Sequence, residues 1–86
     1  MQNNYSEAFD TLTEAQQQFL NIGYPLGATQ CSQSLGKILF MQHKYAEASE
    51  MLTEARRQFI TYDNAVRVAE CSTILDDIYH TQAHSV

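Results

Sequence analysis

The sequence predicts an all-α fold, an α-solenoid of four antiparallel helices arranged as helix-turn-helix repeats. Three observations predict it. The 86-residue chain matches itself without a gap when it is shifted by forty residues, so that Tyr5 falls on Tyr45 and Leu12 on Leu52. Apolar residues recur at intervals of three and four, the spacing of one helix face. Glycine and proline, the two poorest helix formers, occur only three times and once.

The first predicted helix covers residues 5–22. Asn4 is suited to cap it, with Glu7 reaching back from the first turn. Gly23 is expected to end it, because glycine adopts the left-handed conformation that closes many helices. The apolar face of this helix is formed by Tyr5, Ala8, Leu12, Ala15, Phe19 and Ile22.

The second predicted helix covers residues 26–42. Pro25 precedes it and fits a first helical turn, where its missing N–H is not needed. Its apolar stripe consists of Ala28, Cys31, Leu35, Ile38 and Leu39.

The third and fourth predicted helices, 45–62 and 65–81, repeat the first two. Asp63 and Asn64 are expected to cap the fourth helix. Short connections between the helices force neighbours to run antiparallel. The core is expected to contain Leu12, Leu35, Ile38, Ala48, Leu52, Ala55, Phe59 and Leu75.

The order of small and large residues resembles the tetratricopeptide repeat, which is written W-x-x-L-G-x-x-Y followed by A-x-x-x-F. Here the first pattern occurs as Ser32-x-x-Leu35-Gly36-x-x-Leu39, and the second starts at Ala48. The period is similar to that of the long variety of this repeat, and 45–59 looks like repeats of fungal NACHT- or NB-ARC-type signalling proteins. The resemblance implies a right-handed superhelix.

The chain also departs from the family pattern. Ser32 and Ser72 replace the bulky aromatic residue, Asp76 stands where Gly36 stood, and Ile60 occupies the region where a closing proline is usual. HEAT repeats share the period and stay an alternative. By the family's convention, residues 1–86 form one domain with a complete repeat at about 26–62 between two half repeats, which is expected for a segment of a longer array.

The resemblance implies a protein-binding role, because first-type helices of this family line a concave groove that holds a partner. Leu35 and Leu75 align the two first-type helices here. The groove positions are then Gln30, Gln33, Ser34, Lys37, Phe40, Glu70, Thr73, Ile74, Asp77 and Thr81. A clamp for a terminal carboxylate is disfavoured, because Asp77 has the wrong sign at the position equivalent to Lys37. A mixed polar groove of this kind fits a peptide or a helix.

Self-association is the alternative function. The outer helices carry apolar residues that a missing neighbour would cover, and such patches mark association sites. The fourth helix of one copy could pack on the first helix of another and form a homo-oligomer, as a ring or a filament; a two-fold dimer or an exchange of helices competes with this arrangement. The candidate residues are Phe9, Phe19, Ile78 and Tyr79.

Other functions are disfavoured. The formal net charge of −5 argues against nucleic acid and anionic membranes as partners. His80 and His84 share the spacing of a metal pair but lack further ligands. No nucleophile, glycine-rich loop or metal triad points to an enzyme, and we expect no cofactor. Cys31 and Cys71 make no disulfide framework, and with no signal peptide this predicts a cytoplasmic protein.

Overall fold

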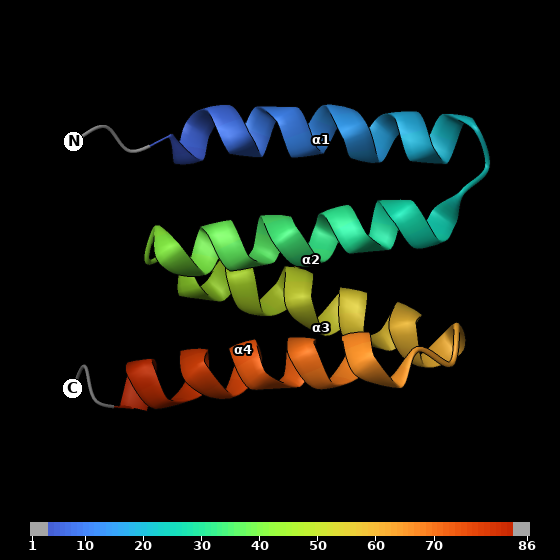
Figure 1. Ribbon diagram of the computed structural model, residues 1–86. Coiled ribbons are helices and arrows are strands. Elements are labelled where there is room, and N and C mark those ends of the chain that lie inside the picture. Colours follow the sequence, from blue (N-terminus) through green and yellow to red (C-terminus); the bar gives the residue numbers. More distant parts are fainter. Residues whose placement is uncertain (1–3, 84–86) are drawn as a thin grey trace.

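The computed structural model describes residues 4–83 and contains four helices in that range. They are α1 (Tyr5–Asn21), α2 (Pro25–Met41), α3 (Tyr45–Thr61) and α4 (Ala65–Ala83). Each helix runs antiparallel to the one before it (Figure 1). The predicted all-α fold and its four helices are therefore confirmed, with ends that differ by one or two residues.

The helices form an open array. The backbone of α2 lies against α1, α3 and α4, whereas the backbone of α1 lies against α2 alone. The molecule measures 44 × 33 × 18 Å. Its smallest dimension is little more than the width of two packed helices with one layer of side chains between them. The inner helices α2 and α3 consequently have neighbours on two sides, and the outer helices α1 and α4 have an uncovered side.

Three turns of the same geometry join the helices. Gly23, His43 and Asp63 adopt left-handed conformations, with φ of 77°, 65° and 58°. In the first turn the Gly23 N–H donates to the Leu20 carbonyl, and the Tyr24 N–H donates to the Phe19 carbonyl. Both bonds recur twenty residues later and again forty residues later. This is the Schellman arrangement, which satisfies carbonyls at a helix end that have no partner within the helix.

The predicted caps have mixed outcomes. Asn64 caps α4, because its Oδ1 accepts a hydrogen bond of 3.2 Å from the Arg67 N–H. Asp63 instead provides the left-handed turn residue before it. The expected cap by Asn4 is wrong: its φ and ψ of −95° and 24° are not the extended values that place a capping side chain over the first turn, and it makes no side-chain cap bond.

The core lies between α2, α3 and α4. Six of the predicted core residues are buried: Leu35, Ile38, Ala48, Leu52, Ala55 and Phe59. Leu75 is half-buried and packs against this core, whereas the expectation that Leu12 belongs to the core is wrong, because Leu12 lies on the outer helix α1 and is only half-buried. Close helix approach depends on Gly36: a Cβ atom there would come within 2.6 Å of the Leu52 Cγ.

A hydrogen bond to a serine hydroxyl repeats along the array, at Ser32 and at Ser72. Gln16 on α1 donates to the Ser32 hydroxyl on α2. Forty residues later Arg56 on α3 donates to the Ser72 hydroxyl on α4, at 2.7 Å. At both places the serine hydroxyl therefore serves as a hydrogen-bond acceptor for a polar side chain of the preceding helix.

Candidate functional site

A groove runs between α2 and α4 on one face of the array. These two helices occupy equivalent places in successive repeats and touch each other directly. The groove has a volume of about 540 Å³. It is lined by Gln33, Ser34 and Lys37 from α2 and by Arg67, Glu70, Thr73, Ile74 and Asp77 from α4.

A closed set of polar contacts forms one end of the groove. The Gln33 amide donates to Glu70 Oε1 at 3.0 Å, and Arg67 Nη1 donates to Gln33 Oε1 at 3.1 Å. Arg67 also approaches Glu70 Oε1 at 3.4 Å, as an ion pair between side chains that are 37% and 48% exposed. Gln33 is buried and uses both its donor and its acceptor in this set, which joins α2 to α4 directly.

The remaining groove carries charges of both signs. Lys37 and Asp77 are exposed and lie on opposite walls, and neither forms an ion pair with another residue in the range 4–83. Ile74 is half-buried and gives the α4 wall an apolar spot. The arrangement can therefore receive a ligand with an acidic group, a basic group and an apolar side chain.

The structure brings together seven of the ten groove residues named from the sequence: Gln33, Ser34, Lys37, Glu70, Thr73, Ile74 and Asp77. Gln30, Phe40 and Thr81 do not line it. Phe40 packs against the core and its ring lies 5.9 Å from that of Tyr45. Whether these residues bind a partner stays a prediction.

Sequence reasoning missed Arg67. It lies one turn before Glu70 and therefore on the same helix face, a spacing that could have identified it. Its equivalent one repeat earlier is Gly27, which has no side chain, so alignment of the two repeats gave no signal there.

The cysteines are packing residues. Cys31 and Cys71 are free thiols at equivalent positions, and both are buried. Burial raises the pKa of the Cys31 thiol, and burial together with the nearby Glu70 carboxylate raises the pKa of the Cys71 thiol. A raised pKa keeps the thiol protonated and a poor nucleophile.

No group of three or more possible metal ligands occurs within residues 4–83. His80 is exposed on α4, and His84, the other member of the histidine pair, lies outside the described residues. In the same range no helix is long and apolar enough to cross a membrane.

The four residues named for self-association lie in different environments. Tyr79 is 69% exposed, and Phe9 and Phe19 are half-buried. The choice of Ile78 is wrong, because it is only 2% exposed and its side chain belongs to the core. It takes the place that Ile38 takes on α2, on the side of the helix that faces inward.

Comparison of the chain with protein-family models, with curated proteins and with solved structures finds no match.

Proposed function

We propose that the chain is a tetratricopeptide-like protein-interaction module that binds a peptide or helix of another protein in the groove between α2 and α4. The observation that carries this proposal is the placement of two repeat-equivalent helices as the walls of one groove. The proposed role is binding, with no chemical step and no cofactor. We place this activity in the cytoplasm, where Cys31 and Cys71 stay reduced.

The polar contacts at the end of the groove support this role. Gln33, Arg67 and Glu70 bond to one another, so the groove keeps its width without a ligand. A groove that is already formed loses less entropy when it binds. The ligand that fits places an acidic group near Lys37, a basic group near Asp77 and an apolar side chain against Ile74.

A peptide library displayed on phage, selected against the whole chain, tests the proposal. Binding of the recovered peptides is then measured by calorimetry. Lys37→Glu should weaken them about tenfold, or by about 1.4 kcal/mol, whereas Lys44→Glu reverses an exposed cation outside the groove and should have no effect. Peptides that bind both variants equally would show that the groove is not the binding site.

Self-association is a second candidate, favoured by the exposed apolar residues of the outer helices. On α4, Tyr79 and Val66 are each 69% exposed. A contact between copies would remove this apolar surface from water. Sedimentation over a dilution series tests it: association should weaken in Tyr79→Lys, and a monomer at high micromolar concentration would exclude it.

A further inference from the structure

The internal repeat allows a covered helix to be compared with an uncovered copy of itself. On α3, Ala48, Leu52, Ala55 and Phe59 are at most 1% exposed. The identical residues forty positions earlier, Ala8, Leu12, Ala15 and Phe19 on α1, are all only half-buried. The difference arises because the backbone of α3 lies against both α2 and α4, whereas within residues 4–83 the backbone of α1 lies against α2 alone. The face of α1 that corresponds to the α2 side of α3 is therefore not covered by any other helix of residues 4–83.

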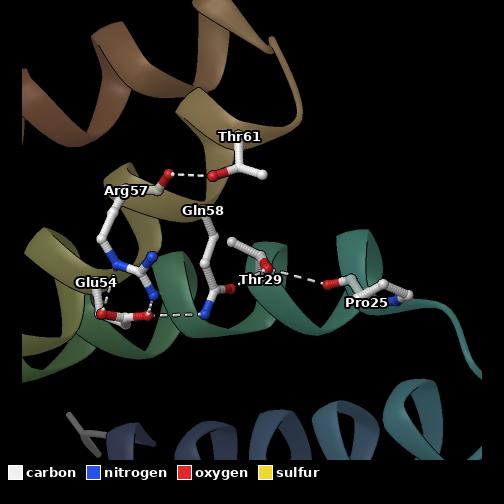
Figure 2. A network of polar contacts seen from close by, with 6 residues as sticks. All are labelled: Pro25, Thr29, Glu54, Arg57, Gln58 and Thr61. Atoms are coloured by element: carbon white, nitrogen blue, oxygen red, sulfur yellow. Dashed lines mark hydrogen bonds and ion pairs between the residues drawn. The ribbon is translucent and has the colours of Figure 1, made fainter.

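Two features of α2 allow it to pack closely on α3. Gly36 leaves room for Leu52, because a Cβ atom at position 36 would lie only 2.6 Å from the Leu52 Cγ. Seven residues earlier, which is two helical turns and hence the same face, the Thr29 hydroxyl lies 2.5 Å from Gln58 Oε1. The Gln58 amide in turn donates to Glu54 at 3.0 Å, so the contact ends on a carboxylate (Figure 2).

The residues that receive α2 on α3 recur unchanged on α1. Leu12, Gln18 and Glu14 occupy the places of Leu52, Gln58 and Glu54. Gln18 and Glu14 are both exposed. Around Gln18 the surface of α1 is hollowed, with a volume of about 450 Å³ and a lining of Ala15, Gln18, Phe19, Asn21 and Ile22. The uncovered face thus has an apolar residue, an amide and a carboxylate in the same relative places as the occupied one.

The fourth helix of a second copy does not fit this face. At the position of Thr29 it has Ala69, which has no hydroxyl, and at the position of Gly36 it has Asp76. A copy packed as α2 packs on α3 would bring the Asp76 carboxylate against Leu12, where it would be desolvated without a partner. This obstacle counts against the particular stacking of α4 on α1 that the sequence suggested.

Charge further restricts which helix can bind to the uncovered face of α1. α1 carries Glu7, Asp10 and Glu14 and has no lysine or arginine, whereas α2 carries Lys37 and has no acidic residue. An acidic helix on α1 would face like charges. We propose that the uncovered face of α1 binds a helix of a partner protein that lacks acidic residues and carries a serine or threonine followed seven residues later by a glycine.

The probe for this site is a synthetic peptide with the sequence of residues 24–42, held helical by a hydrocarbon staple between positions 30 and 34 and labelled with a fluorophore. Its binding to the whole chain is followed by fluorescence anisotropy. We expect saturable binding, which should weaken about tenfold or more when the peptide carries Gly36→Asp. Peptide with Thr29→Ala should bind several-fold more weakly, because the amide of Gln18 then lacks its hydroxyl partner.

Variants of the protein show where the peptide binds. Gln18→Leu should weaken binding, while Gln17→Leu, an exposed neighbour on the same helix, should not; circular dichroism confirms that both are folded. Lys37→Glu in the protein should also leave binding unchanged, which separates this site from the α2–α4 groove. The proposal is overturned if the peptide does not bind, if Gln18→Leu binds it as well as the parent, or if the chain alone associates and Gln18→Leu disperses it, because a second copy would then be the occupant.

Discussion

Leu12 and Leu52 offer a matched pair of substitutions, because both lie in the sequence Leu-Thr-Glu-Ala at the same place in the repeat. Leu52 is 0% exposed and fits against Gly36, so Leu52→Ala removes a packed side chain and leaves a cavity. Such truncations cost about 2–5 kcal/mol. Leu12 is half-buried, and water can fill the space that it leaves, so Leu12→Ala should cost only about 1 kcal/mol.

Thermal and urea denaturation followed by helical ellipticity measure both costs. For a domain of this size each kcal/mol lowers Tm by roughly 4–8 °C. We therefore expect Leu12→Ala to melt a few degrees below the parent, and Leu52→Ala to melt far lower or to be unfolded at room temperature. Helix propensity cancels in the comparison, since the same leucine is replaced by the same alanine.

Equal costs for the two substitutions would refute this reasoning. If Leu12→Ala were as damaging as Leu52→Ala at every protein concentration, α1 would be covered by the chain itself in solution. If the cost of Leu12→Ala rose with protein concentration, a second copy would cover the face instead. A parent-like melt of Leu52→Ala would show that Leu52 does not fill the space beside Gly36.

Three further predictions concern the turns, the thiols and the acidic range. Asp63→Gly should raise Tm, because glycine adopts the positive φ of this turn without the strain that a side chain adds; an unchanged or lower Tm would contradict this. Cys31 and Cys71 should react slowly with a disulfide reagent in the folded protein and rapidly in urea, since burial raises the pKa of both thiols; equal rates would place them at the surface. Hydrogen bonds from Arg57 and Gln58 lower the pKa of Glu54, so its contribution to stability is present above about pH 4 and is lost as the pH falls through the folded pKa. In urea titrations at several pH values, the free energy of unfolding of Glu54→Gln should therefore fall less steeply with decreasing pH than that of the parent. An equally steep fall in both proteins would show that the Glu54 carboxylate plays no part in it.

Much of the fold could be predicted from the sequence, because the repeat gives two residues for each structural position. Gly23 and Pro25 predicted one turn directly. The forty-residue repeat then predicted an equivalent turn at 63–65, where neither glycine nor proline is present. Burial was harder to predict. Leu12 and Leu52 are identical in sequence context, and only the number of neighbouring helices distinguishes them.

Part of the groove could be predicted from the sequence for the same reason. Residues such as Lys37 and Asp77 could be placed because they keep a fixed offset from Leu35 and Leu75. The contacts of Gln33 with Arg67 and Glu70 could not be anticipated, since they depend on the distance between α2 and α4 rather than on spacing within either helix.

The three-residue turns between helices of nearly equal length have a consequence for how the chain folds. Each helix meets its main partner within a single hairpin, so most contacts join residues that are close in sequence. Little loop-closure entropy is lost before such contacts form, and topologies of low contact order fold fast. Folding can therefore begin at the α2–α3 hairpin, which holds most of the buried residues, and spread outward to α1 and α4 by adding one helix at a time.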